Sequence, residues 1–208
     1  MEILIVNKDL LKEPVEIQVS AYANYEFFSV YILDSIKRKK FIEAIVSTDV
    51  KLNYKNGNYF VVVEDGKVIA QFSLWEPFMK RASDIAYILS GAYKAPIASG
   101  IKDFLAWLDM ENKAGIPCHN LDGENHWYLN SLTVHPDYQG KKIGTKIIKD
   151  FIIPYIKSKN ANLLYLYTNS TRNLEFYTKI GFEQFDYREF QYNGKTLPNY
   201  SLIYQNIF

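Results

Sequence analysis

The stretch of sequence that decides the fold is Leu132-Thr133-Val134-His135-Pro136-Asp137-Tyr138-Gln139-Gly140-Lys141-Lys142-Ile143-Gly144-Thr145. Its first residues favour a buried strand, and the apolar spacing that continues through Lys146-Ile147-Ile148 favours a helix, so the two glycines lie in the turn between them. The first N–H groups of a helix have no acceptor within the helix, and the helix dipole adds positive charge at that end. The stretch therefore predicts an anion-binding turn.

The glycine spacing excludes the two common phosphate-binding motifs. A nucleoside-triphosphate loop has two glycines separated by four residues and followed by Lys and Ser or Thr, and the sequence lacks this pattern. It also lacks the three-glycine dinucleotide motif with an acidic residue about 20 positions later. The turn therefore suits another phosphate-bearing ligand.

The turn resembles the coenzyme A motif of the GNAT superfamily of N-acetyltransferases, in which a hydrophobic strand and a Val-x-Pro corner lead into Gln/Arg-x-x-Gly-x-Gly/Ala. The residues that match a common form of the motif, Gln-Gly-Lys-Gly-Ile-Gly, are Gln139, Gly140, Lys141, Ile143 and Gly144. Lys142 departs from it, because the family usually has glycine there. A lysine leaves its backbone N–H free and adds positive charge, so we interpret Lys142 as a variation on the motif.

This resemblance implies acetyl-coenzyme A as the co-substrate, with no metal. The N–H groups of the turn would hold the pyrophosphate, and the exposed strand edge would pair with the amide-bearing arm of the coenzyme as an added strand does. The coenzyme-binding residues implied in this way are Leu132, Thr133, Val134, Gln139, Gly140, Lys141, Lys142, Ile143, Gly144 and Thr145.

A second motif follows downstream in the order strand, cap, helix, glycine. Residues 162–168 favour a strand covered on both faces, Asn169-Ser170-Thr171 offers helix-capping side chains, and Gly181 is placed to end a helix over residues 172–180. The family has a similar block, Asn-x-x-Ala-x-x-Phe-Tyr-x-x-x-Gly-Phe. Phe176, Tyr177, Gly181 and Phe182 match it, whereas Ser170 and Asn173 replace its Asn and Ala. The resemblance implies that Ser170, Asn173 and Tyr177 contact the coenzyme.

The rest of the pattern predicts an α/β fold, GNAT-like, with a mixed and mostly antiparallel sheet flanked by helices. Apolar spacing predicts a helix over residues 22–48, and Asp65-Gly66 between two β-favouring runs predicts a hairpin over 59–75. Apolar stripes beginning at Ile85 and Ile101 predict a helical insertion, about residues 78–125, before the coenzyme-binding strand.

The remaining boundaries are set mainly by glycine and proline. We expect loop at Gly115-Ile116-Pro117 and over residues 121–124, and strands over 126–134, 182–192 and 200–207, with Leu197-Pro198-Asn199 lengthening the last connection. Pro154 should kink or end the helix that follows the turn, because it cannot donate to the carbonyl of Asp150.

Composition bounds the class of protein. A chain of 208 residues with 48% hydrophobic content predicts one domain over residues 1–208, and 24 basic against 23 acidic residues give no net field that attracts nucleic acid or an anionic membrane. The single Cys118 excludes an internal disulfide. The N-terminal residues lack signal-peptide features, and no apolar run approaches ~18 residues, so we expect a cytoplasmic protein with no membrane partner.

Catalysis needs a group that stabilises the departing thiolate and a base that deprotonates the amine. Tyr177 matches the position from which GNAT enzymes donate to the departing thiolate. A phenol of pKa ~10 is a weaker acid than a thiol of pKa ~8.5, so full proton transfer is uphill by about 2 kcal/mol and a hydrogen bond is the safer role. The candidates for a base near the coenzyme strand are Glu124, His126, Tyr128 and Asn130, of which only His126 titrates near neutrality unaided.

The sequence therefore predicts an acyltransferase that moves an acetyl group from acetyl-coenzyme A to a primary amine by direct attack in a ternary complex. A non-catalytic acyl-coenzyme A sensor on the same fold is the alternative. A third interpretation, aminoacyl transfer from charged RNA, predicts a basic groove, which the near-zero net charge does not favour. The acceptor, a small molecule or a peptide, is not identified, and the oligomeric state, a homodimer included, stays open.

Overall fold

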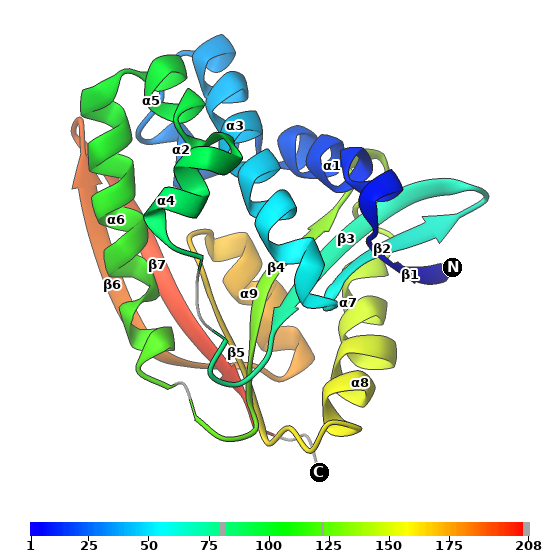
Figure 1. Ribbon diagram of the computed structural model, residues 1–208. Helices are drawn as coiled ribbons and strands as arrows, with labels where there is room; N and C mark the ends of the chain where they lie inside the picture. The colour runs from blue at the N-terminus through cyan, green and yellow to red at the C-terminus, as the bar shows by residue number, and fades with distance from the viewer. Residues whose placement is uncertain (80–81, 122, 206–208) are drawn as a thin grey trace.

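The computed structural model describes residues 1–79, 82–121 and 123–205, and one mixed sheet organises this part of the chain (Figure 1). Its strands lie in the order β1-β2-β3-β4-β5-β7-β6. Every neighbouring pair is antiparallel except β4 and β5, which are parallel. The predicted fold class is confirmed. The strands are β1 (Glu2–Ile5), β2 (Tyr59–Glu64), β3 (Lys67–Trp75), β4 (His126–Val134), β5 (Leu163–Thr168), β6 (Glu183–Tyr192) and β7 (Lys195–Tyr204).

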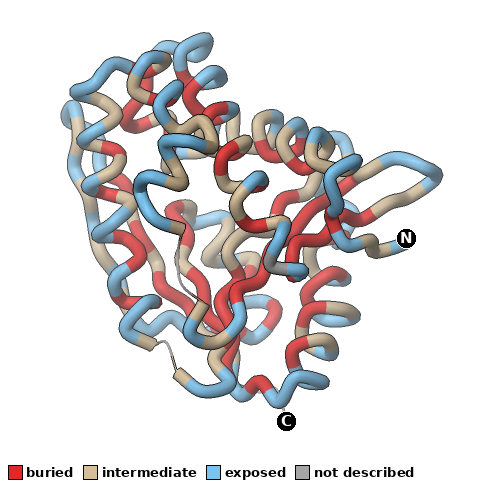
Figure 2. The backbone as a smooth tube through the Cα atoms, in the orientation of Figure 1, coloured by how far each residue is buried: buried red, intermediate tan, exposed pale blue. Residues whose placement is uncertain are grey.

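Helices cover both faces of the central strands, so that β2, β3 and β5 are largely buried, whereas β1 and β6 have no buried residue (Figure 2). The two faces can be followed along β2, where Phe60 and Val62 belong to one hydrophobic cluster and Tyr59 and Val61 to the other. The first cluster contains the helices after the turn, and the second contains the N-terminal and inserted helices. The α-helices are α1 (Lys12–Tyr22), α2 (Glu26–Ser29), α3 (Ser35–Asn53), α4 (Asp84–Tyr87), α5 (Lys94–Ser99), α6 (Ile101–His119), α7 (Ile143–Lys146), α8 (Ile153–Lys157) and α9 (Thr171–Ile180).

The β2–β3 hairpin forms where the Asp-Gly pair predicts it. Glu64 pairs with Lys67, and the two residues between them, Asp65 and Gly66, have φ values of 50° and 73°. Two positive φ values in a two-residue loop match the right-handed twist of the strands on either side.

The prediction of one helix over residues 22–48 is wrong, because the chain breaks between α1 and α3. Tyr25 has extended backbone, with φ −70° and ψ 132°, and α3 begins after Asp34, whose carboxylate accepts from the Lys37 N–H at 2.8 Å. The apolar residues of this segment keep a near-helical spacing across the break, so their periodicity conceals it.

Arg38 explains how the break is stabilised. It lies in the basic run 37–40, yet it is buried, with only 8% of its surface exposed. Its guanidinium donates to the carbonyl oxygens of Ala23 at 2.8 Å, Ile32 at 2.8 Å and Leu33 at 3.0 Å. These carbonyls belong to the two breaks on either side of α2, so one side chain satisfies acceptors that a continuous helix would have paired.

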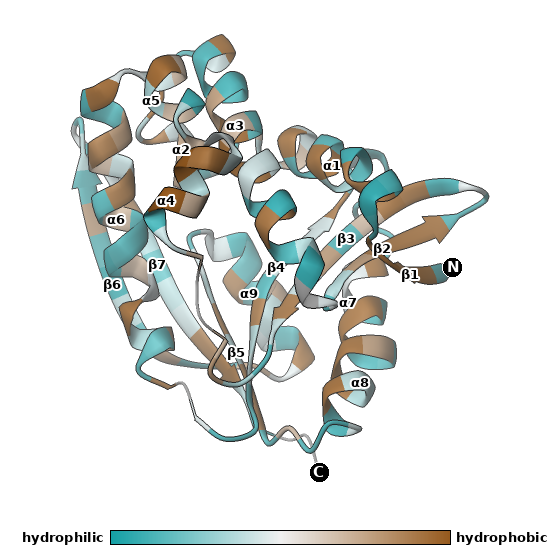
Figure 3. Ribbon diagram, in the orientation of Figure 1, coloured by the Kyte–Doolittle hydropathy of each residue, from teal (hydrophilic) through white to brown (hydrophobic). Residues whose placement is uncertain are grey.

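The helical insertion is present, but much of its apolar surface is exposed. It consists of α4, the π-helical segment η3 (Ile88–Ala92), α5 and α6, and it packs beside α3. Ile85, Leu89 and Ile97 are 70%, 80% and 78% exposed, and Figure 3 shows hydrophobic stretches on the short helices α4 and α5. Trp107 and Met110 of α6, in contrast, are buried in the core. The apolar stripes therefore predict helices correctly without predicting burial.

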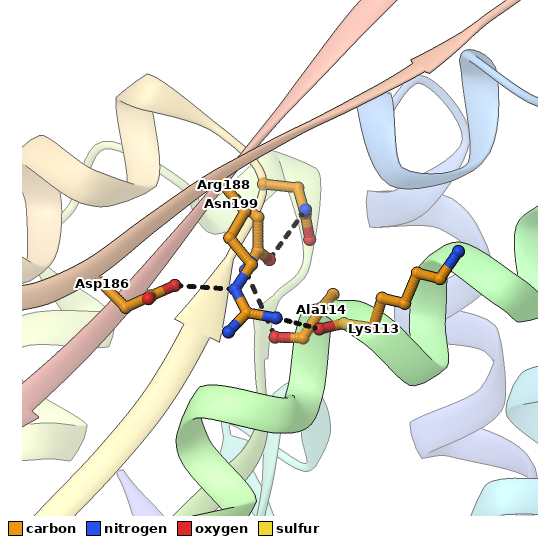
Figure 4. Close-up of polar contacts among 6 residues, drawn as sticks. Lys113, Ala114, Asp186, Arg188 and Asn199 are labelled. Atoms are coloured by element: carbon orange, nitrogen blue, oxygen red, sulfur yellow. Dashed lines mark hydrogen bonds and ion pairs between the residues drawn. The ribbon is translucent and has the colours of Figure 1, made fainter.

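The expected loop at Gly115-Ile116-Pro117 is wrong, because α6 continues to His119. Pro117 has no N–H to donate to the carbonyl of Lys113, four residues earlier. Arg188 of β6 supplies the missing donor, with Nη1 at 3.2 Å from the Lys113 oxygen (Figure 4). A contact distant in sequence therefore offsets the local effect of the proline.

The last two strands form a tighter hairpin than the sequence predicts. β7 begins at Lys195, directly after Asn193-Gly194, so residues 197–199 lie inside the strand and do not lengthen the connection. Pro198 is tolerated because β5 ends at Thr168, opposite Tyr200, and leaves that edge of β7 without a ladder partner. Residues 206–208, part of the predicted last strand, lie outside the described residues.

The helix after the turn neither stops nor kinks sharply at Pro154. It runs through α7, the π-helical segment η5 (Ile147–Ile152) and α8, and the wider π turn immediately precedes the proline. Its predicted inner face is confirmed, with Ile147, Ile148 and Ile152 fully buried. None of the helices in the described ranges combines the length and the apolar composition needed to cross a bilayer.

We expect Arg38→Ala to lower the free energy of unfolding by about 2–4 kcal/mol, because three carbonyls lose a charged donor. Urea denaturation would measure the change. Lys39→Ala, at an exposed neighbouring position, is the control and should stay within about 0.5 kcal/mol of wild type. Equal stability of the two variants would contradict this account of the break.

Candidate functional site

The candidate site is an opening in the sheet where β4 and β5 separate. These parallel strands share the pairs His126 with Leu163, Trp127 with Leu164 and Tyr128 with Tyr165, and the ladder goes no further. β4 continues to Val134 and stays paired with β3 throughout, while β5 stays paired with β7. One edge of β4 and one edge of β5 therefore border a gap that widens toward their carboxyl ends (Figure 1).

A β-bulge in β4 lies at the point where the strands separate. Ser73 pairs with Ser131 and Leu74 with Leu129, so Asn130 is the extra residue on β4. A bulge bends its strand and increases the local twist, which directs the following residues away from the parallel neighbour. Asn130 donates to the Ser73 hydroxyl at 3.0 Å, so its side chain helps to hold the bulge.

The predicted anion-binding turn lies at the carboxyl end of β4, beside this opening. Gly140 and Lys142 both have left-handed backbone, with φ values of 78° and 60°. Lys142 thus occupies a conformation that favours glycine, which explains the residue the family usually has there. α7 begins at Ile143, so the N–H groups of Ile143, Gly144 and Thr145 are the unpaired donors of a helix start.

Gln139, at the start of the turn, is engaged within the protein. Its N–H donates to the Pro136 carbonyl at 3.2 Å, and its side-chain Nε2 donates to the Val134 carbonyl at 3.1 Å. Both the backbone N–H and the side-chain amide of Gln139 therefore have acceptors within the protein, so the N–H would have to exchange its partner to bind a phosphate. Lys141 lies near, with Nζ 4.8 Å from the centre of the Tyr138 ring.

Gly144 has a packing role that the sequence does not show. A Cβ added there would lie 3.1 Å from Cζ of Phe176, on α9, and 3.9 Å from Val134, on β4. The glycine therefore allows α7 to approach α9 closely. Phe176 immediately precedes Tyr177, so any larger residue at 144 would disturb the position of both aromatic rings.

Tyr177 is buried on α9, and its hydroxyl is close enough to those of Tyr25 and Tyr22 to interact with them electrostatically. The side chain is 8% exposed, and its ring packs against Phe176 and Phe182. Burial raises its pKa well above the ordinary value, and the charges that Tyr25 and Tyr22 would carry on ionisation raise it further. Tyr177 therefore stays a neutral hydrogen-bond donor at working pH.

Tyr22 and Tyr25 approach the same opening from the break between α1 and α2. Their rings stack with centres 5.7 Å apart. The Tyr22 hydroxyl accepts from Thr133 of β4 at 3.0 Å, and the Tyr25 hydroxyl lies 3.2 Å from the Thr168 hydroxyl of β5. The pair therefore spans the gap between the two strands, and the pKa of each is raised, chiefly by burial.

This arrangement could not be found from local sequence signals. Apolar spacing places Tyr22 and Tyr25 on a continuous helix, and only the break around Arg38 directs them toward the sheet. The aromatic residues that follow behave as the spacing predicts: Phe28 and Tyr31 are buried in the core.

The two residues that depart from the second motif occupy different surroundings. Asn173 donates to the Thr168 hydroxyl at 3.0 Å, so it supports the edge of β5. Ser170 is the N-cap residue of α9, but its side chain makes no capping hydrogen bond, which differs from the expected capping chemistry. Gly181 ends α9 as predicted, with φ 116°.

His126 and Glu124 are not brought to this group of hydroxyls. His126 pairs with Leu163, five residues before Thr168 on β5, which corresponds to roughly 17 Å along the strand. Its Nδ1 is engaged at 2.6 Å with the Leu121 carbonyl, and Glu124 lies in the exposed turn before β4. Among the described residues, no group of three or more His, Cys, Asp or Glu side chains could hold a metal ion.

Comparison with known families agrees with this geometry. The family model of the acetyltransferase (GNAT) domain matches residues 103–184, from α6 to the start of β6, a range that holds the opening, the turn and Tyr177. Residues 103–184 belong to a GNAT acetyltransferase domain. The predicted class of enzyme, an acyltransferase, is thereby confirmed. No curated protein matches the sequence.

Solved structures share the fold of the GNAT domain at low sequence identity. An agmatine N-acetyltransferase, solved as the apo form of a point mutant, is 13% identical, with a TM-score of 0.65 over 98% of each chain. Polyamine N-acetyltransferase from Drosophila melanogaster is 14% identical, with a TM-score of 0.62 over 98% of this chain and 99% of the other. PaiA N-acetyltransferase from Thermoplasma acidophilum, solved with coenzyme A, is 14% identical, with a TM-score of 0.56 over 98% of each chain.

The buried tyrosines give the GNAT domain a defined response to alkaline pH. Burial raises the pKa of Tyr22, Tyr25, Tyr59 and Tyr177 in the folded state. A raised folded pKa gives stability that is fully present below the unfolded pKa of ~10 and is lost as pH rises above it. We expect the urea midpoint to fall steeply between about pH 9 and pH 11, with the part of the tyrosinate absorbance that belongs to these four residues appearing only on unfolding. A midpoint at about pH 11 equal to that at about pH 8 would contradict the burial of these hydroxyls.

Lys142 offers a direct test of the backbone at the turn. We expect Lys142→Gly to raise the free energy of unfolding by about 1 kcal/mol, because glycine adopts the left-handed conformation without steric cost. Urea denaturation would measure the gain. The neighbouring Lys141→Gly is the matched control and should destabilise, since Lys141 does not have positive φ. Destabilisation by Lys142→Gly would contradict the described turn.

Proposed function

We propose that the protein is an N-acetyltransferase that transfers an acetyl group from acetyl-coenzyme A to a primary amine by direct attack in a ternary complex. The observation that carries the proposal is the opening between β4 and β5, which has an anion-binding turn at its mouth and Tyr177 within it. The GNAT domain match covers this whole arrangement.

The residues around the opening suit the coenzyme. The helix start at Ile143 offers donors for a pyrophosphate, and the left-handed residues Gly140 and Lys142 turn the preceding backbone toward the same side. The edge of β4 that faces away from β3 over Leu132, Thr133 and Val134 can pair with an amide-bearing arm as an added strand does, and the Val134 carbonyl there already accepts from Gln139. Ser170 lies at the start of α9, on the other side of the opening.

The chemistry requires an uncharged amine and a leaving thiolate. Acetyl-coenzyme A supplies the activated acyl group, and the amine displaces the thiol from it. Tyr177 remains protonated in its buried position, so we assign it the hydrogen bond that stabilises charge on the departing sulfur. Backbone N–H groups on the open edge of β4 can polarise the thioester carbonyl in the same way.

His126 and Glu124 do not act directly at Tyr177 in this proposal, because they lie at the opposite end of β4. An alkylammonium of pKa ~10.4 is deprotonated in only about one molecule in a few thousand at neutral pH. The ammonium group loses one proton to water before attack, and the hydroxyls of Tyr22 and Thr133 can accept hydrogen bonds that orient the free amine. The second proton, released when the amide forms, passes through solvent to the departing thiolate. His126 would assist only through intervening solvent.

A small amine is the acceptor that we propose. Structures with the same fold include an agmatine N-acetyltransferase and a polyamine N-acetyltransferase. The aromatic pair Tyr22 and Tyr25 bonds to both strands that border the opening, and we propose that it faces the amine. We further propose that residues 1–208 act as one domain, in the cytoplasm.

The proposal is tested by release of free thiol from acetyl-coenzyme A with a panel of amines, including diamines, amino sugars, amino acids and peptide N-termini. Turnover with at least one class of amine is expected. Tight binding of acetyl-coenzyme A without turnover of any amine would favour a non-catalytic sensor instead.

We expect Tyr177→Phe to lower turnover by about 10²-fold while the affinity for acetyl-coenzyme A stays nearly unchanged, because the variant loses only a donor to the developing charge. Thiol release would measure the rate, and calorimetry the affinity. Tyr187→Phe, on the exposed part of β6, is the matched control and should turn over normally. Unchanged turnover in Tyr177→Phe would remove this residue from the mechanism.

A further inference from the structure

A chain of hydrogen bonds joins the insertion helix α6 to the opening. Asn199 of β7 donates through Nδ2 to the Ala114 carbonyl of α6 at 3.3 Å. Its Oδ1 accepts from Asn169 Nδ2 at 3.1 Å, and the Asn169 main-chain N–H donates to the Tyr25 hydroxyl at 2.9 Å. Figure 4 shows Asn199 directed toward α6 beside Arg188.

Both asparagines are buried, with 0% of Asn199 and 1% of Asn169 exposed. Asn169 Nδ2 also donates to the Pro198 carbonyl at 3.0 Å, so its side chain is held in one orientation by two acceptors on β7. Buried amides cost free energy unless they are paired, and such a pair permits few alternative arrangements. Asn169 directly follows β5, so this pair sets where the end of β5 lies relative to β7.

The position of Asn169 determines the position of Tyr25. The Tyr25 hydroxyl accepts from the Asn169 N–H and lies 3.2 Å from the Thr168 hydroxyl, which itself accepts from Asn173. With the N–H as a fixed donor, the hydroxyl hydrogen of Tyr25 points either to Thr168 or into the opening. A shift of Asn169 would therefore move Tyr25, which stacks on Tyr22 beside the proposed site of acetyl transfer.

We infer that Asn199 and Asn169 are positioning residues, through which the insertion helix α6 fixes the Tyr25 hydroxyl at the opening between β4 and β5. This inference rests on the proposed acetyltransferase function of the same opening. The insertion thereby contributes to the site through α6, which packs against β5, β6 and β7.

The test compares Asn199→Ala with Tyr25→Phe and with the double variant. We expect Asn199→Ala to lower turnover roughly tenfold, with the affinity for acetyl-coenzyme A within about twofold of wild type. The reason is that a displaced Tyr25 side chain affects the geometry of the reaction more than the binding of the coenzyme. If Asn199 acts through Tyr25, the double variant should be no slower than Tyr25→Phe alone. Normal turnover in Asn199→Ala, or multiplicative effects in the double variant, would overturn the inference.

Arg188→Ala is the matched control. Arg188 reaches the adjacent carbonyl of α6, at Lys113, from the neighbouring strand, and its other hydrogen bond is with the Asp186 carboxylate. Arg188 lies opposite Asn199 in the β6–β7 ladder, but its removal takes away none of the hydrogen bonds of the asparagine pair, so turnover should remain within about twofold of wild type. A loss equal to that of Asn199→Ala would show that general loosening of α6 is responsible, and would overturn the inference.

A readout independent of activity separates this inference from the proposed function. In protein labelled with 3-fluorotyrosine, the ¹⁹F signal absent from Tyr25→Phe identifies Tyr25. That signal should shift in Asn199→Ala, and in a second variant, Asn169→Ala, but not in Arg188→Ala. An unmoved signal overturns the inference, whereas a shifted signal in a protein that acetylates no amine overturns the proposed function alone.

Discussion

The separation of β4 from β5 is the constraint on which the rest of the structure depends. A parallel pair that ends after three residues leaves two strand edges unpaired in the middle of a sheet, and unpaired backbone groups are costly unless something occupies them. The bulge at Asn130 directs β4 away from β5 at this point. The tyrosines beside the gap do not replace the missing backbone pairing between the two strands. We interpret the gap as a space kept open for an extended ligand.

Close packing then links the two ends of the proposed site. Gly144 lets α7 lie against Phe176, so the start of the anion-binding helix and the ring next to Tyr177 share one contact. On the other face, Arg38 holds the break that directs Tyr22 and Tyr25 toward the sheet. The hydroxyls around the opening are thus positioned by glycine contacts and carbonyl bonds that lie outside it.

The sequence predicts those parts of the fold whose signals are local. Asp65-Gly66 predicts its hairpin, and the block 176–182 predicts a helix ending in glycine, because each depends on the conformation of a few adjacent residues. The bulge at Asn130 and the burial of Arg38 depend on partners distant in the chain, and no short pattern signals them. For the site, the resemblance supplies Tyr177 and the turn, whereas the hydrogen bonds that join Tyr22 to β4 and Tyr25 to β5 emerge only from the three-dimensional structure.

The short β4–β5 ladder also divides the sheet into two halves, each contiguous in sequence. β1 to β4 come from residues 2–134, and β5 to β7 come from residues 163–204. Rotation of one half about the three shared pairs would change the width of the gap without breaking any antiparallel ladder. The helix α6 precedes β4 in the chain but packs against β5, β6 and β7, so the chain crosses to the second half before it returns to complete the first.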